Sequence, residues 1–154
     1  MAASEFTFSH SLRVRWAEVD RQGIVFNGHY LMYFDVGITE YWRALGYPYP
    51  DGLLQHGTDL YVKKATVEYH ASAQYDDVLN VMVRVARIGR SSLQFLIEIH
   101  RIEIHRGAEH LISGEVLYVN ADPTTRKSQP VPEFLCQSIG KLERIPPGAV
   151  SSKA

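Results

Sequence analysis

Asp20 is the residue of this sequence whose surroundings best suit it to chemistry. It follows Val19 and precedes the segment Gly23-Ile24-Val25-Phe26, so the sequence surrounds its carboxylate with apolar neighbours. A carboxylate in such surroundings is poorly solvated and can act as a nucleophile or a general base. The alternative is structural, with Asp20 capping a turn. Glu18, two positions earlier, is the nearest acid that could replace it.

Asn27 and Gly28 stand immediately before a predicted helix. The first turn of a helix has unpaired backbone N–H groups and the positive end of the helix dipole. Such groups can hold the negative charge that develops on a carbonyl oxygen during acyl transfer. Asn27 could instead be a simple N-cap, which is compatible with that role. Asp20 and the start of the helix together predict an acyl-transfer site.

The predicted helix runs from about residue 29 to residue 45 and must be largely buried. Asp35, Thr39 and Arg43 recur every four residues and form one narrow polar stripe, whereas nearly all the other positions are apolar. A helix with so little polar surface is one that most of the protein surrounds. Gly46 and the prolines after it end the helix.

The remainder of the chain is rich in strand patterns. Alternating hydrophobic residues predict strands at 6–16, 60–70, 79–88, 93–105 and 110–121. A change of parity predicts a bulge near His100–Arg101, and residues 106–108 are typical of a hairpin turn. A short helix is expected at 132–140, followed by a frayed tail. An antiparallel sheet around one helix would retain open edges, so we expect a homodimer or a homotetramer.

Composition sets the broad class of protein. The chain has 154 residues, 45% of them hydrophobic, which suits a single domain over residues 1–154, with a core at about 6–135 and a tail from about 140. Sixteen basic and seventeen acidic residues argue against nucleic acid as a partner. A single cysteine, Cys136, argues against a disulfide framework. With no secretory signal or membrane span in the pattern, we expect a cytoplasmic protein without a membrane partner.

Three segments resemble the 4-hydroxybenzoyl-CoA thioesterase family over about residues 10–135. They are VRWAEVDRQGIVFNGHYLMYFDVGITEYWRALG, KATVEYHASAQYDDVLNVMVRVARIGRSSLQF and ADPTTRKSQPVPEF. The D-x-x-G-[IV]-V-[aromatic] element before the helix is the most specific of the matching motifs. The resemblance implies the hotdog fold, an α+β architecture in which an antiparallel sheet wraps around one long central helix.

The resemblance also implies roles for individual residues. Asp20 would be the catalytic carboxylate, and the backbone N–H of Asn27 would polarise the thioester carbonyl. The family often has His or Tyr at the Asn27 position, and often Pro where Ser72 stands, so this sequence departs from the pattern at both places. The expected substrate-binding residues are Gly23, Val25, Phe26, Tyr30, Arg87, Arg90, Ser91 and Ser92. The arginines would hold the CoA phosphates, with Lys63 and Lys64 as weaker candidates. The alternative is that Arg87 and Arg90 are ordinary surface charges beside a turn, with no role in binding.

The function that follows is hydrolysis of an acyl-CoA thioester to a free acid and CoA, with no cofactor. A non-catalytic acyl-CoA-binding protein and a hotdog dehydratase or hydratase are the alternatives. The acyl group can be aromatic or aliphatic. His100, His105 and His110 recur every five residues, which suits neither a helix face nor a strand face, so we expect no metal site.

Overall fold

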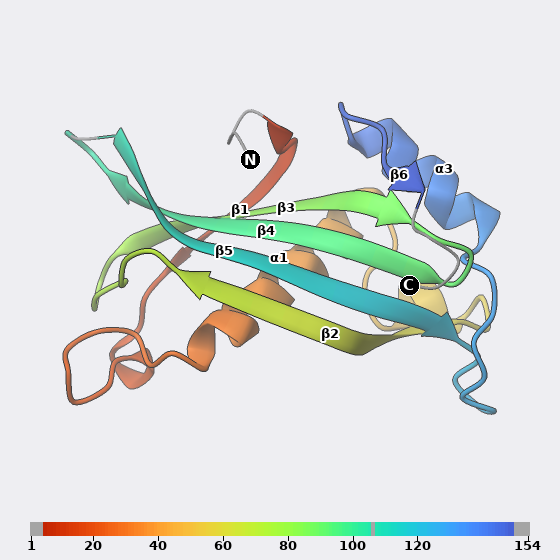
Figure 1. Ribbon diagram of the computed structural model, residues 1–154, viewed down its shortest axis with the longest axis horizontal. Coiled ribbons are helices and arrows are strands. Elements are labelled where there is room, and N and C mark those ends of the chain that lie inside the picture. Colours follow the sequence, from red (N-terminus) through yellow and green to blue (C-terminus); the bar gives the residue numbers. More distant parts are fainter. Residues whose placement is uncertain (1–4, 106, 150–154) are drawn as a thin grey trace.

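The computed structural model describes residues 5–105 and 107–149 and is built on one curved antiparallel sheet. Its long strands lie in the order β1-β3-β4-β5-β2 (Figure 1). Their bounds are β1 Phe8–Arg13, β2 Asp59–Tyr69, β3 Val78–Ile88, β4 Ser92–Glu103 and β5 Gly107–Ala121. The first strand is shorter than the predicted 6–16, because the chain turns into the short helix η2 (Trp16–Glu18) soon after Arg13.

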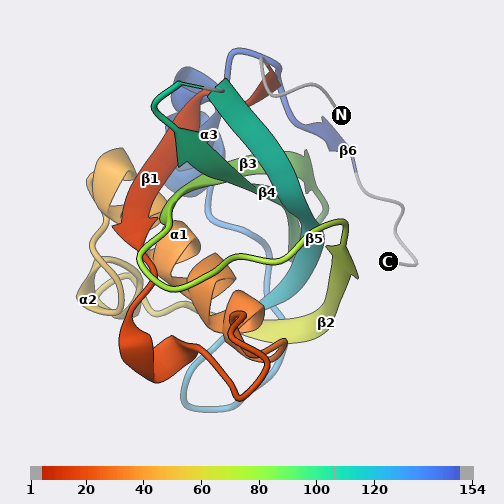
Figure 2. The ribbon, with the colours of Figure 1, turned by 90° about the vertical axis from the view of Figure 1, so that its left-hand side faces the viewer.

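Helix α1, His29–Leu45, has the predicted bounds. The sheet curves around it, so that α1 lies in the hollow of the sheet (Figure 2). Its buried side chains include Tyr33, Phe34 and Tyr41. Gly46 ends the helix in the left-handed region, with φ of 92°, which glycine adopts without steric cost.

The contact between α1 and the sheet depends on two glycines. A Cβ atom at Gly37 of α1 would lie 2.6 Å from Cγ1 of Val81 on β3, closer than carbon atoms can approach. On β5, a side chain at Gly114 would overlap the ring of Phe34. Both positions therefore have to be glycine for the helix to lie this close to the strands.

The C-terminal segment differs from the frayed tail expected from about residue 140. Helix α3 covers Glu133–Leu142, Glu143 is buried, and β6 (Gly148–Ala149) pairs in parallel with β3. Two further short helices are η2 (Trp16–Glu18) and α2 (Asp51–Leu54), which the sequence pattern did not predict. Of the predicted hairpin turn, Arg106 lies outside the described residues.

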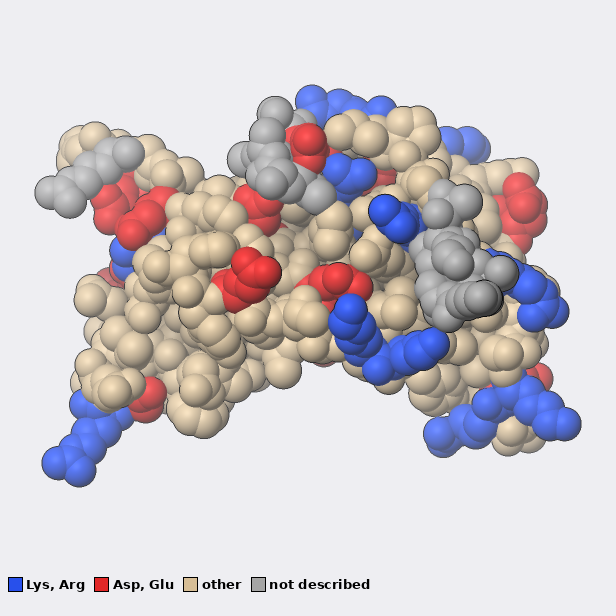
Figure 3. All heavy atoms as spheres, in the orientation of Figure 1, with Lys and Arg blue, Asp and Glu red and all other residues tan. Residues whose placement is uncertain are grey.

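Charged side chains of both signs are interspersed on the face of the sheet opposite α1, with uncharged side chains between them (Figure 3). The face therefore offers no broad surface of one sign among the residues drawn in colour. None of the helices in the described part of the chain is long and apolar enough to span a bilayer.

Glu143 joins the C-terminal segment to the core. Its Oε1 atom accepts hydrogen bonds from the Tyr41 hydroxyl at 2.8 Å and from the Val85 backbone N–H at 3.2 Å. Within the described residues, its buried Oε2 atom has no hydrogen-bond partner. Burial raises the pKa of Glu143 more than these hydrogen bonds and the charge of Arg84 lower it. Folding therefore makes this carboxyl easier to protonate than it is in the unfolded chain.

Stability should consequently fall as pH rises through the pKa of Glu143. A carboxyl whose pKa is raised by folding contributes most below its unfolded pKa, and this contribution is lost above the folded pKa. Glu143→Gln does not titrate, so its Tm relative to wild type should rise between pH 4 and pH 8. We expect a change of about 2–4 °C, which about 1 kcal/mol produces in a chain of this size. Thermal unfolding followed by circular dichroism measures it.

Exposed Glu133 in the first turn of α3 provides the matched control. The Tm difference between Glu133→Gln and wild type should stay flat over the same pH range. A flat difference for Glu143→Gln as well would contradict the raised pKa. A constant offset in Tm, from the unpaired amide group, would not affect this comparison.

Candidate functional site

The loop between η2 and α1 is closed by pairing of its two arms. Val19 and Val25 form an antiparallel bridge, and the backbone N–H of Phe26 donates to the carbonyl of Glu18 at 3.0 Å. The Val25 N–H donates to Ala73 at 2.9 Å, which ties the loop to the segment after β2. The loop lies at the N-terminal end of α1 (Figure 2).

Asp20 stands at the start of a tight turn within this loop. Its Oδ1 atom accepts the backbone N–H of Gln22 at 2.7 Å, and its own N–H donates to the carbonyl of Ile24 at 2.9 Å. Gly23 makes the turn possible with φ of 79°. No donor among the described residues reaches Oδ2 of Asp20. The turn therefore fixes the orientation of the carboxylate through one oxygen and leaves the other oxygen available.

Glu18 is committed to the structure. Its buried carboxylate accepts hydrogen bonds from the Arg15 backbone at 2.8 Å, the Tyr33 hydroxyl at 3.0 Å and the Arg15 side chain at 3.1 Å. Burial by itself would raise the pKa of Glu18, but these hydrogen bonds outweigh it and hold the pKa below the ordinary value. Both oxygens are occupied, so Glu18 is a poor substitute for Asp20.

The N-terminus of α1 presents unpaired backbone donors. Gly28 occupies the N-cap position, so the alternative that Asn27 is the N-cap is wrong. Asn27 is exposed, and its carbonyl accepts the Tyr69 hydroxyl at 3.1 Å. Within the described ranges, the N–H groups of Asn27 and Gly28 have no acceptor. They can therefore donate to an oxygen atom of a ligand.

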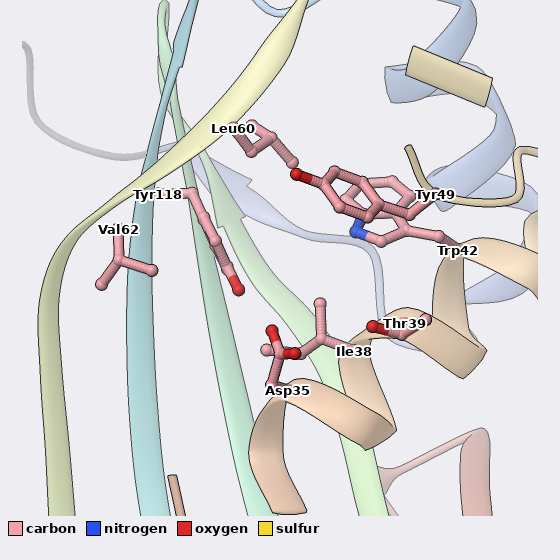
Figure 4. A pocket seen from close by; sticks show the side chains of 8 residues that line it. All are labelled: Asp35, Ile38, Thr39, Trp42, Tyr49, Leu60, Val62 and Tyr118. Carbon is pink, nitrogen blue, oxygen red and sulfur yellow. The ribbon is translucent and has the colours of Figure 1, made fainter. Parts of the chain in front are cut away.

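A groove runs along α1, between this helix and the strands β2 and β5. It comprises two adjoining hollows of about 210 and 190 Å³. Both are lined by Asp35, Ile38, Val62 and Tyr118; the first adds Trp42 and Tyr49, and the second adds Leu31 and Phe34. The polar ends of Asp35 and Tyr118 point toward one another across the first hollow (Figure 4). The groove is thus apolar along its walls and polar at a few points.

Two tyrosines of this groove remain protonated. Burial, and after it the charge of Asp35, raises the pKa of Tyr118. Burial together with the neighbouring Asp59 raises the pKa of Tyr49. Their hydroxyls are therefore hydrogen-bond donors at neutral pH, and the Asp35 carboxylate is an acceptor. The sequence analysis did not predict that these residues line a groove. The polar stripe of the helix, with Asp35 and Thr39, could have indicated it, because both residues line the first hollow.

The predicted substrate-binding residues are not gathered in one place. Gly23 and Phe26 are exposed in the loop, whereas Val25 and Tyr30 are buried in the core. The hydroxyl of Tyr30 accepts the Ala73 N–H at 3.0 Å, so this side chain holds the segment after β2 and does not face solvent.

The other four lie at the turn between β3 and β4. Arg87 and Arg90 are exposed there, Ser91 is half-buried and Ser92 is buried. This turn is at the end of the sheet away from the loop that contains Asp20 (Figure 1). Lys63 and Lys64 are exposed on β2, and Lys64 lies 4.0 Å from Glu115.

Known proteins similar to this chain include thioesterases. The acyl-CoA thioester hydrolase YbgC of Escherichia coli is 29% identical over 128 residues, which are 83% of this chain and 92% of YbgC. An aspartate-to-asparagine variant of 4-hydroxybenzoyl-CoA thioesterase, solved with 4-hydroxybenzoyl-CoA, has a TM-score of 0.78 at 18% identity and covers 86% of this chain and 97% of that one. A 1,4-dihydroxy-2-naphthoyl-CoA thioesterase from Synechocystis has a TM-score of 0.76 at 19% identity, and the match covers 86% of this chain and 94% of that one.

The solved structures share the arrangement of a sheet around a central helix, so the expected hotdog fold is confirmed. A family model described as the thioesterase-like superfamily matches residues 14–139, from the end of β1 into α3. This match confirms the resemblance seen in the sequence. The chain belongs to the thioesterase-like superfamily.

Proposed function

We propose that this thioester hydrolase cleaves acyl-CoA at the N-terminal end of α1, with Asp20 as the catalytic residue. The observation that carries the proposal is the Asp20 carboxylate, held through Oδ1 with Oδ2 free, in the loop that leads to unpaired N–H groups at the helix start. YbgC, which is named as an acyl-CoA thioester hydrolase, supports the choice of substrate class. The thioesterase that was solved with its substrate as an aspartate-to-asparagine variant supports a role for an aspartate.

In the proposed reaction the thioester oxygen accepts a hydrogen bond from the N–H of Asn27. Oδ2 of Asp20 either takes a proton from the attacking water or attacks the carbonyl carbon itself, forming an anhydride that water then cleaves. In both routes the C–S bond breaks, CoA leaves as a thiolate that gains a proton, and the acid is released. The developing oxyanion is stabilised by a donor that is already in position.

The groove along α1 is the proposed acyl site. Its apolar walls favour burial of an acyl group by the hydrophobic effect. Asp35 offers an acceptor and Tyr118 a donor to polar groups on that acyl chain. The pantetheine and nucleotide would then extend from the helix start toward solvent.

The CoA phosphates require basic residues, and within one chain the β3–β4 turn, which carries Arg87 and Arg90, lies at the opposite end of the sheet from the loop before α1 (Figure 1). Pairing of two chains through β2 offers a solution. The outer edge of β2 has no strand partner among the described residues, and positions 62–66 of this strand are exposed. Antiparallel pairing about a two-fold axis reverses the direction of the second sheet. The β3–β4 turn of one copy would then lie toward the Asp20 loop of the other.

Asp20→Asn should lower kcat for acyl-CoA hydrolysis at least about a hundredfold, because the amide can neither attack nor accept a proton. Acyl-CoA binding should persist, since the groove is unchanged. Thiol release and binding are measured on the same purified protein, with oligomer state and Tm as controls. Glu18→Gln is the contrast: it should lower Tm while retaining more activity than Asp20→Asn.

A variant Asp20→Asn that folds, binds and hydrolyses within about threefold of wild type would contradict the assignment, because less than ~1 kcal/mol of the barrier would then come from this carboxylate. Acyl-CoA binding by the wild type without thiol release, over a panel of aromatic and aliphatic acyl-CoAs, would favour a non-catalytic binding protein instead.

Replacement of both Arg87 and Arg90 by alanine should raise KM for acyl-CoA several-fold and leave kcat nearly unchanged. Contacts with phosphates far from the carbonyl bind the ground state and the transition state equally. Arg13→Ala is the matched control, because its guanidinium is also exposed and pairs with Asp76 at 3.1 Å. If KM stays constant in the double variant, the nucleotide binds elsewhere, and Lys63 and Lys64 are the next residues to replace.

Light scattering should give at least twice the 17.5 kDa mass of one chain. Thr66→Lys introduces a charge at the exposed edge of β2, outside the lining of the proposed acyl groove, and should shift the protein toward the monomer, with loss of activity. Ile104→Lys, at an exposed position away from that edge, should not. A monodisperse wild-type monomer that hydrolyses acyl-CoA would exclude the paired arrangement.

A further inference from the structure

A cluster of histidine and glutamate side chains lies on the face of the sheet opposite α1. On β4, Ile97 and Ile99 point into the core, so the alternate residues Glu98 and His100 point to the other face. Across the ladder, His100 is paired with His110 of β5. The proposed acyl groove lies on the α1 side, so this cluster is separate from it.

A break in strand register brings His110 into the cluster. Ile99 pairs with Ile112, and regular pairing would next place His100 opposite Leu111. The register shifts here by one residue, so that His100 faces His110 instead. Such a shift moves a side chain from one face of a sheet to the other. Leu111 is consequently buried in the core and His110 joins Glu98 and His100 outside.

The distances within the cluster suit a metal ion. Nε2 of His100 lies 3.0 Å from Oε1 of Glu98, and Nε2 of His110 lies 3.6 Å from the same oxygen. The donor atoms of all three residues lie within 4.8 Å of one another. Two ligands of a tetrahedral zinc ion are separated by about 3.4 Å, since each bond is about 2.1 Å long. The rings of His100 and His110 are stacked, with centroids 4.7 Å apart and planes 9° apart, so the two rings would have to rotate out of this stack to bring the three donors onto one ion.

The charge of Glu98 also calls for a cation. This residue is only 4% exposed, and within the described ranges its carboxylate contacts the two imidazoles. A buried carboxylate without a counter-charge is costly, and a divalent ion would supply that charge.

His110 is held in place by its neighbours. Its Nε2 atom lies 2.9 Å from the carbonyl of Ile112 and 3.0 Å from Oγ of Ser113. Oγ of Ser113 also lies 3.0 Å from Nε2 of His70, whose ring packs on that of His110 with centroids 4.7 Å apart. A metal on Nε2 would replace the proton that this atom shares with the carbonyl. Ser113, which also contacts His70, therefore orients the His110 ring before an ion binds, and the ion takes the place of its contact with Nε2.

We propose that Glu98, His100 and His110 bind one divalent transition-metal ion of the zinc type, with water in the fourth position. Two imidazoles and one carboxylate form a donor set that suits such ions better than calcium or magnesium. A hollow of about 160 Å³, lined in part by Glu98 and Ser113, gives access from solvent. The ion joins β4 to β5 at the register break and thereby stabilises this end of the hairpin.

Titration with zinc chloride tests the proposal on the full chain after dialysis against a chelator. Isothermal titration should show one zinc ion per chain, and zinc should raise the Tm of the wild type. His100→Ala and His110→Ala should each weaken zinc binding at least about a hundredfold. His105→Ala is the matched control: this exposed histidine lies in the same hairpin, outside the cluster, and its loss should leave binding unchanged.

Cobalt chloride gives a second readout on the wild type alone, since tetrahedral cobalt produces visible absorption bands that a surface complex with water does not. Glu98→Gln keeps the size of the side chain and should lose these bands, which covers the case that an alanine variant fails to fold. Absence of saturable zinc binding by the wild type, or equal binding by folded His100→Ala and wild type, would overturn the proposal. Thiol release should not change with zinc, which keeps this test independent of the proposed function.

Discussion

The close contact between α1 and the sheet is the constraint on which the rest of the structure depends. Gly37 leaves room for Val81, and Gly114 leaves room for the ring of Phe34, so neither position can carry a larger residue without separating the two layers. This contact sets how closely the helix approaches β3 and β5. The loop in front of its N-terminus and the groove along its side consequently have fixed positions as well, which is what a preorganised site requires.

Strong periodicity made the central part of the fold predictable. The bounds of α1 follow from its apolar residues and from Gly46, and the strand patterns identify β2 to β5 to within a few residues. The short helix α3 was predicted, but the order of the residues after it was not, because Glu143 pairs with the distant Tyr41 and no local pattern contains that pairing. A polar, proline-rich composition resembles that of a loop whether or not the segment packs.

The site could be predicted only in part, for the same physical reason. The loop motif points to Asp20, but the sequence could not tell that Glu18 is fully occupied by Arg15 and Tyr33. Nor could it tell that Tyr30 is buried, since tyrosines serve equally in cores and in ligand sites. His100 and His110 are brought together by one extra residue in a strand. Their spacing in the sequence suits neither a helix face nor a strand face, so it gave no indication that the two side chains meet.

The link between Tyr41 and Glu143 has a consequence for biosynthesis. These two residues are 102 positions apart, so a ribosome releases α1 long before it releases the carboxylate that satisfies the hydroxyl buried within it. The outer strands pair late as well, because β1 needs β3 and β2 needs β5. For most of translation, the apolar helix α1 of a nascent chain therefore lacks the strands and the C-terminal segment that bury it. The protein can reach its native state only after nearly all of the described chain has emerged, and until then its apolar helix is exposed to aggregation.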